Sequence, residues 1–170
     1  MKKFWYLLYV IVVMIVLIPK KELYFSAEAL LQKDEFYLSG ETLSAGWFWQ
    51  DIEHVRVLSG MSALAEIERI RIVPWIVVND LYFDSIKAVD GFALFFPGQI
   101  ERARLRYALW NPLNVSVDID GDFGHAQGSF NLSEGKLLLY FDALPQMRRY
   151  PLLVSKLRSQ GEKLVYERTF

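Results

Sequence analysis

Residues 102–141, RARLRYALWNPLNVSVDIDGDFGHAQGSFNLSEGKLLLYF, decide the fold of this chain. Apolar and polar residues alternate through most of this stretch, which is the period of strands that bury one face. Gly, Pro, Asn, Asp and Ser gather between the alternating segments, where they favour turns. The pattern therefore predicts an antiparallel meander with one apolar face. Its four strands are expected at residues 102–109, 115–120, 126–132 and 137–141.

The segments on either side of this meander carry weaker signals. Residues 64–68 fit either a strand or a helix, because their apolar positions suit both periods. Pro151 is well placed at the start of a short helix, and Gly161 is well placed just past its end. The expected fold class is mainly β, an antiparallel curved sheet or a β-sandwich with one or two short helices. Further strands are expected at residues 36–38, 42–43, 54–58, 68–73 and 164–170.

The N-terminus carries an uncharged, almost wholly apolar run between two pairs of lysines. As a helix the run rises about 22 Å, and the flanking lysines can extend it towards the roughly 30 Å of a bilayer core. A cleaved signal peptide begins in the same way, but the small residues of a cleavage site are missing near Ser26. We therefore expect a retained transmembrane helix. Its anchoring side chains are Phe4, Trp5, Leu7, Leu8, Val10, Ile11, Val12, Val13, Ile15, Val16, Leu17 and Ile18.

These signals divide the chain into three parts. We expect a transmembrane anchor at residues 1–21, a short connecting helix at residues 22–34 and an exported β-rich domain at residues 35–170. Lysines flank the apolar run on both sides, so charge counting alone leaves the orientation nearly balanced. Because only a few residues precede the run, we expect the N-terminus in the bacterial cytoplasm. The anchor then lies in the inner membrane and the β domain in the periplasm.

The composition argues against several classes of function. The formal net charge is −1, with 19 basic and 20 acidic residues, so no basic surplus indicates nucleic-acid binding. The chain has no cysteine, which excludes disulfides, thiolate catalysis and cysteine-bound metals. His54 and His125 lack the spacing of a zinc motif. Asp118, Asp120 and Asp122 lack the glycine and glutamate that complete a calcium loop. We therefore expect a protein that is not an enzyme and that uses no cofactor or metal.

Two groups of residues are candidates for contact with a partner or a lipid. The first group is aromatic and is either packed in the core or exposed as an interfacial patch. The second group is three arginines on one strand face, suited to anionic headgroups. A solvated face balanced by Asp118 and Asp120 on the next strand is the simpler explanation of these arginines. The two groups are Trp47, Phe48 and Trp49, and Arg102, Arg104 and Arg106.

One stretch also resembles a known family. Residues 115–132 form a predicted strand, a glycine-containing turn and a second strand, and residues 135–139, GKLLL, follow as a G-x-L-x-L strand. This succession is similar to the type II secretion system protein N family, whose members carry an N-terminal anchor and a periplasmic β domain related to AsmA-like lipid-transport proteins. The resemblance covers the C-terminal half of the chain.

Anchor, β domain and resemblance together favour two functions. The first is a non-enzymatic assembly or scaffold component of a cell-envelope machine, of the type II secretion kind, whose partners are envelope or secretion-system proteins. The second is a lipid- or lipopolysaccharide-binding transport module with an apolar groove in the β domain. The strands at residues 115–119 and 137–141 face a packed core in the first case and an open groove in the second.

Overall fold

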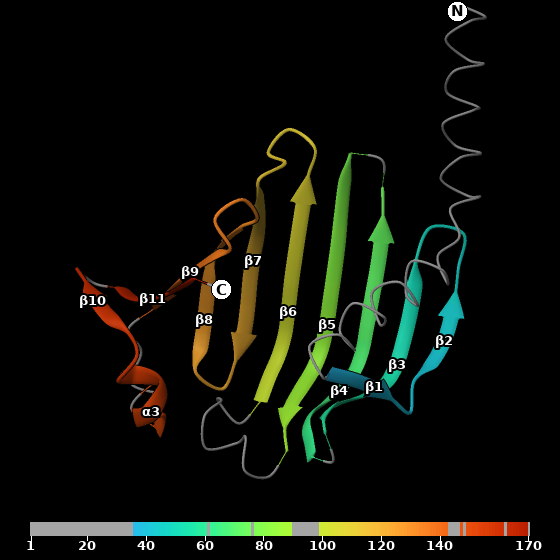
Figure 1. Ribbon diagram of the computed structural model, residues 1–170, viewed down its shortest axis with the longest axis horizontal. Helices are drawn as coiled ribbons and strands as arrows, with labels where there is room; N and C mark the ends of the chain where they lie inside the picture. Colours follow the sequence, from blue (N-terminus) through green and yellow to red (C-terminus); the bar gives the residue numbers. More distant parts are fainter. Residues whose placement is uncertain are drawn as a thin grey trace, which may run out of the picture.

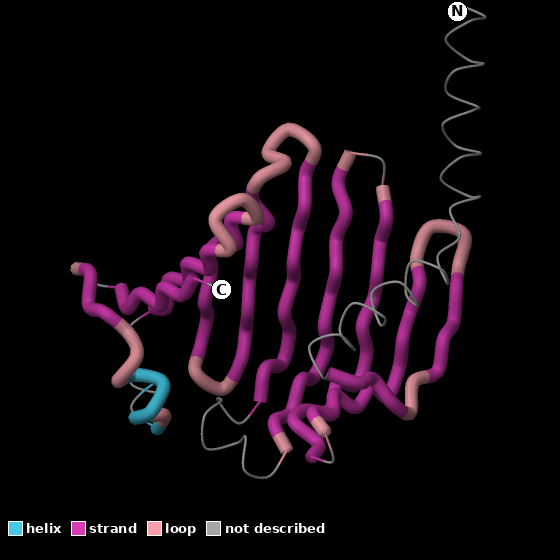
Figure 2. Tube along the Cα trace, in the orientation of Figure 1, coloured by secondary structure: helices cyan, strands magenta, loops and turns pink. Residues whose placement is uncertain are grey.

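The computed structural model describes residues 36–60, 62–75, 77–89, 99–142, 147, 149–161 and 163–169. These residues form a mainly β structure, a single open antiparallel sheet of eleven strands with one short helix (Figures 1 and 2). No helix among them is long and apolar enough to cross a membrane. The anchor and the connecting helix expected at residues 1–34 lie outside the described residues.

The strands vary from three to thirteen residues in length. Their bounds, with those of the helix, are β1 (Phe36–Ser39), β2 (Thr42–Ala45), β3 (Gln50–Ser59), β4 (Ser62–Pro74), β5 (Val78–Ala88), β6 (Gln99–Ala108), β7 (Asn114–Gly121), β8 (Gly124–Asn131), β9 (Lys136–Asp142), α3 (Pro151–Val154), β10 (Arg158–Gln160) and β11 (Lys163–Thr169).

The sheet is a meander in its centre and changes order only at its ends. Neighbouring strands follow the order β1-β3-β4-β5-β6-β7-β8-β9-β11-β10, and β2 also pairs with β3. The meander predicted from residues 102–141 is confirmed as β6 to β9. Of the two expected architectures, the open sheet is found and the β-sandwich is wrong for the described residues. In Figure 1, β9, β11 and β10 turn away from the upright central strands, so the sheet curls towards this edge.

The apolar face of β6 to β9 is packed. Val117, Ala126 and Leu139 face this core at 7%, 0% and 7% exposure. The segment around α3 contributes to the same core through partly buried apolar side chains such as Leu153. Removing a large apolar side chain from water contributes roughly 1.5–3 kcal/mol to folding, so this packing fixes which face of the meander is hidden.

The expected helix after Pro151 is present but short. Pro151 occupies its first turn, as predicted, because proline lacks the N–H that a first turn leaves unpaired. The helix ends at Val154, however, and β10 intervenes before Gly161. Gly161 lies in the turn between β10 and β11 with a φ of 64°. Its expected role as a helix terminator is therefore wrong, and it serves a hairpin turn that requires the left-handed conformation.

The four neighbouring strands β3 to β6 share an irregularity at which the spacing of their buried residues changes, and we call this irregularity the crease. Buried or partly buried residues face the core three positions apart on each of these strands, where plain alternation would space them by two. On β3 and β5, one residue inside this three-residue spacing has a left-handed backbone. These residues are His54 of β3, with a φ of 58°, and Ser85 of β5, with a φ of 54°. Both lie opposite Glu68 of β4 in the strand register. The four pairs are Ile52 and Val55, Ile67 and Ile70, Phe83 and Ile86, and Ile100 and Ala103.

Candidate functional site

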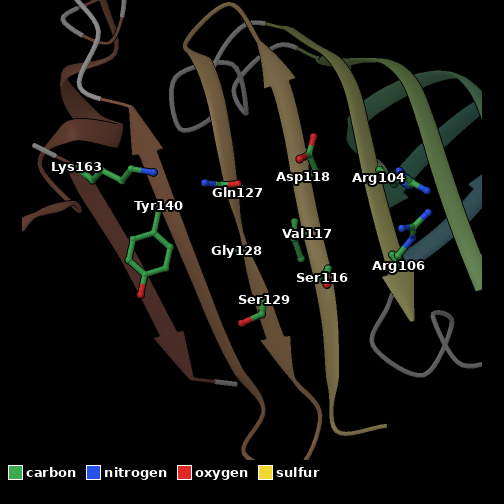
Figure 3. Close-up of a pocket in the computed structure, with 10 residues that line it drawn as sticks. All are labelled: Arg104, Arg106, Ser116, Val117, Asp118, Gln127, Gly128, Ser129, Tyr140 and Lys163. Carbon is green, nitrogen blue, oxygen red and sulfur yellow. The ribbon is translucent and has the colours of Figure 1, made fainter. Parts of the chain in front are cut away.

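The polar face of the sheet holds a broad, open trough of about 780 Å³. Figure 3 shows its side chains spread over β6 to β9 and β11. Cations, one carboxylate, hydroxyls and an amide all line it, so it presents hydrogen-bond donors and acceptors together. The lining residues are Arg104, Arg106, Ser116, Val117, Asp118, Gln127, Gly128, Ser129, Tyr140 and Lys163.

Strand register brings these polar groups together. Arg104 lies opposite Asp118, Asp118 opposite Gln127, and Gln127 opposite Tyr140, so the four form one row across β6 to β9. Alternation on each strand then places the next polar residues in a parallel second row. That row contains Arg106, Ser116 and Ser129. The trough therefore follows from the same alternation that predicted the strands.

Asp80 of β5 holds both arginines at the edge of the trough. Its Oδ1 accepts hydrogen bonds from Arg104 Nε at 3.1 Å and from Arg106 Nε at 2.9 Å, and Arg106 Nη2 donates to its Oδ2 at 3.3 Å. The Asp80 side chain is only 10% exposed, whereas the arginines are 36% and 46% exposed. One buried carboxylate against two cations leaves a net positive charge at this edge.

The expected pairing of the arginines with Asp118 and Asp120 is confirmed for the strand register. The expected ion pairs between these side chains are not formed. Arg104 and Arg102 do lie opposite these aspartates. Arg104 instead forms an ion pair with Asp80 on β5, which is more buried, so that the attraction is less screened by water. Arg102 is exposed and makes no ion pair within the part of the chain that the structure describes.

Arg104 makes a second contact that fixes its direction. Its guanidinium carbon lies 5.1 Å from the centroid of the Tyr82 ring, within the range of a cation–π interaction. Tyr82 is directly opposite Arg104 on β5. Of the three arginines that we predicted as contact residues, Arg104 and Arg106 line the trough. Arg102 does not line it.

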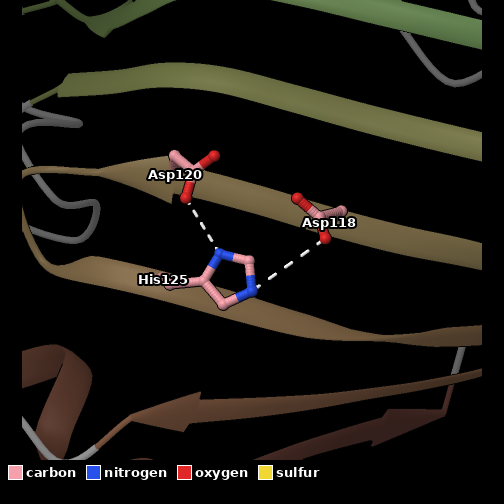
Figure 4. Close-up of side chains that lie close together, drawn as sticks. All are labelled: Asp118, Asp120 and His125. Atoms are coloured by element: carbon pink, nitrogen blue, oxygen red, sulfur yellow. Dashed lines mark hydrogen bonds and ion pairs between the residues drawn. The ribbon is translucent and has the colours of Figure 1, made fainter.

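His125 of β8 forms a cluster with two aspartates of β7 (Figure 4). Its Nδ1 lies 2.9 Å from Asp120 Oδ1, and its Nε2 lies 3.9 Å from Asp118 Oδ2. The hydrogen bond to Asp120 raises the pKa of His125 above its usual value, against an opposing effect of partial burial, and the charges of Asp118 and Asp142 add to the increase. This cluster was not predicted, although the two-residue turn at Asp122 sets the register that pairs β7 with β8.

The cluster has the donor set of a metal site but the setting of a solvated surface. One ligand atom from each of Asp118, Asp120 and His125 lies within 4.8 Å of the others. Both aspartate side chains are about half exposed, at 54% and 50%, which is the usual state of carboxylates on the polar face of a strand. Asp122, the third aspartate of the possible calcium loop, lies in the turn, where its backbone N–H donates to Gln99 O at 3.1 Å.

The predicted aromatic group is exposed. Trp47, Phe48 and Trp49 lie between β2 and β3 with 74%, 36% and 43% of their surface accessible. Phe48 stacks on Trp75 of the neighbouring β4–β5 loop, with ring centroids 5.8 Å apart and planes 6° from parallel. Core packing is therefore not the role of these three residues among the described elements. They also lie apart from the trough lining.

Comparisons of the chain with family models, with curated proteins and with solved structures gave no match. The resemblance of residues 115–139 to the type II secretion system protein N family therefore stays a prediction. Within the structure, these residues form most of β7, β8 and β9. The same three strands supply seven of the residues that line the trough, so this stretch is central to any function of the site.

Proposed function

We propose that this protein is a non-enzymatic assembly component of a cell-envelope machine, of the type II secretion kind. In this proposal an N-terminal helix anchors it in the inner membrane and its β domain lies in the periplasm. The polar trough is the surface on which a partner protein binds. The observation that carries this proposal is the trough itself, which is wide, open and lined by groups of both charges.

The chemistry of the trough suits a protein surface. Arginine and tyrosine are enriched where proteins bind each other, and Arg104, Arg106 and Tyr140 line the trough. Ser116, Ser129 and Gln127 supply neutral donors and acceptors between the charged ends. Because the buried Asp80 already holds both arginines in place, a partner carboxylate can meet cations that lose little further freedom on binding.

A lipid-binding module remains the second candidate, and it is supported by a different feature of the same surface. Arg104, Arg106 and Lys163 give the trough three cations, which suit an anionic headgroup. The apolar face gives acyl chains less support, because Leu139 and Phe141 are 7% and 5% exposed and are packed in the core. A lipid bound by this protein would therefore be recognised through its headgroup.

Affinity purification of the tagged full-length chain from gently solubilised native membranes tests the assembly role. The informative variant is Gln127→Arg, because Gln127 is exposed in the middle of the trough and a larger cation there obstructs a partner. Ser44→Arg is the matched control, since Ser44 is exposed on β2 and lies outside the trough. We expect an envelope protein to accompany the wild type and Ser44→Arg, and to be lost from Gln127→Arg.

The same preparations separate the two candidates. If the assembly role is right, mass spectrometry finds one envelope protein whose recovery depends on Gln127. If no envelope protein is recovered while one anionic lipid accompanies the wild type at close to one molecule per chain, the assembly role is wrong and headgroup binding takes its place. Loss of that lipid on Lys163→Glu would locate it in the trough.

A further inference from the structure

One end of the sheet collects the exposed apolar side chains of the described structure. Among the described residues, ten large hydrophobic side chains are exposed, and all except Tyr37 lie in the loops that join β2 to β3, β4 to β5, β6 to β7 and β8 to β9. In an antiparallel meander these four loops share one end, which is the upper edge of the sheet in Figure 1. We call the described residues of these loops, 46–49, 75, 77, 109–113 and 132–135, the aromatic rim.

The rim has the composition of a membrane-interface surface. Four of the five tryptophans of the chain are in it, and Trp47 and Trp110 expose 74% and 73% of their surface. Leu109 and Leu113 are each more than half exposed beside Trp110. Only one residue of the four loops, Glu134, is charged. Tryptophan favours the boundary between lipid headgroups and acyl chains, because its ring is apolar and its N–H can still reach water.

We propose that the aromatic rim rests in the headgroup layer of a lipid bilayer and that the sheet stands upright on the membrane. The rim enters the bilayer no deeper than this headgroup layer, because loop backbones carry N–H and C=O groups that need water or headgroup partners. Large exposed apolar patches on proteins mark surfaces that bind something, and the scarcity of charge in the rim favours lipid over a polar protein surface. This surface is separate from the trough, so the proposal stands whether or not the trough binds a partner.

The predicted anchor can be accommodated in this orientation. Seventeen residues separate Ile18, the last residue of the apolar run, from Phe36 at the start of β1. A fully extended segment of this length spans at most about 60 Å. Phe36 pairs with Ser59 at the end of β3 that lies away from the rim. The ten residues of β3 rise only about 33 Å, so the chain is long enough to return from the far end of the sheet to the membrane.

Fluorescence of the full-length chain in lipid nanodiscs, whose two faces are both open to solvent, tests this proposal. The rim variant keeps Trp110 alone and carries phenylalanine in place of Trp5, Trp47, Trp49 and Trp75. The control variant has phenylalanine at all five tryptophan positions and a single reporter, Asp122→Trp, in the exposed turn at the opposite end of the sheet. Emission is compared between plain and acyl-brominated phosphatidylcholine, and then with added iodide.

We expect brominated lipid to quench Trp110 and iodide to leave it nearly unchanged, with the opposite result for the Asp122→Trp reporter. Iodide quenching of Trp110 as strong as that of the control would show a rim in water and overturn the proposal. Protection of Trp110 from both quenchers would also overturn it, because the rim would then be covered by protein, either another part of this chain or a second copy. Far-UV circular dichroism confirms that both variants keep the β fold. Neither outcome depends on an envelope partner, so failure here is distinct from failure of the assembly role.

Discussion

Replacing Asp80 with asparagine tests whether this buried carboxylate organises the positive edge of the trough. Asp80→Asn keeps the size of the side chain and removes the charge that accepts three hydrogen bonds from Arg104 and Arg106 at 2.9–3.3 Å. Hydrogen bonds to charged groups contribute about 1.5–3 kcal/mol each when buried. Both arginines are more than a third exposed and can be rehydrated, so we discount the sum to about 2 kcal/mol.

The matched control is Asp84→Asn on the same strand. The Asp84 side chain is 42% exposed, and its Oδ2 lies 3.9 Å from Arg69 Nη1, so its loss should cost at most about 1 kcal/mol. We would measure thermal unfolding of the full-length chain in mild detergent by far-UV circular dichroism. A loss of about 2 kcal/mol lowers the Tm by roughly 4–8 °C for a chain of this size. Equal Tm values for Asp80→Asn and Asp84→Asn would show that Asp80 does not organise the positive edge of the trough.

Three further predictions follow from the core and from two titrating groups. Gly128→Ala should destabilise the fold by about 3 kcal/mol or more in the same unfolding assay, because a Cβ at Gly128 would overlap the backbone of Leu138, which cannot move away as a side chain could. The ring of His125 should titrate above its usual pKa in an NMR pH series, and Asp120→Asn should lower that pKa. This histidine stabilises the fold fully below pH 6.5, and the contribution is lost as pH rises through the folded-state pKa. Asp51 of β3 accepts a hydrogen bond from Arg71, which is the main reason why its pKa is lowered from 3.8. Its contribution to stability is therefore present above pH 3.8 and is lost as pH falls through the folded-state pKa. Asp51→Asn should therefore weaken the fold at neutral pH and flatten the acid side of a Tm-against-pH curve.

The central meander could be predicted from the sequence because its pattern is regular. From β6 to β9 the polar and apolar residues alternate with short turns between them, and one register satisfies all four strands. The trough follows from that register, since Arg104, Asp118, Gln127 and Tyr140 are all on the polar face. The sequence does not, however, show that β5 approaches from the other side, so the contact of Asp80 with the arginines could not be predicted.

The first strands were harder to predict because of the crease. Ile67 and Ile70 of β4 are both buried and lie three residues apart, which is also the spacing of one helix face. Leu64 and Ile67 have the same spacing, which is why residues 64–68 fit a helix as well as a strand. A left-handed residue at His54 and at Ser85 shifts the alternation on the neighbouring strands, and neither is a glycine that would mark such a position.

The aromatic rim could not be predicted because its residues are far apart in the sequence. The Trp47–Trp49 group was recognised as a candidate surface, but an aromatic run beside a strand is equally consistent with a core. Trp75 and Trp110 lie in two later loops, and each alone is an ordinary exposed residue. Only the strand order brings the loops to one end of the sheet, where Phe48 stacks on Trp75.

Site-specific photo-crosslinking in living cells tests whether the trough is the surface on which a partner protein binds. Benzoylphenylalanine placed at Gln127 of the full-length chain puts the reactive group in the middle of the trough, and the same residue at Ser44 serves as the control on edge strand β2. We expect a discrete crosslink from Gln127 to one envelope protein and no such crosslink from Ser44. The absence of any protein crosslink from Gln127, or the same crosslink from both positions, would contradict the proposed role of the trough.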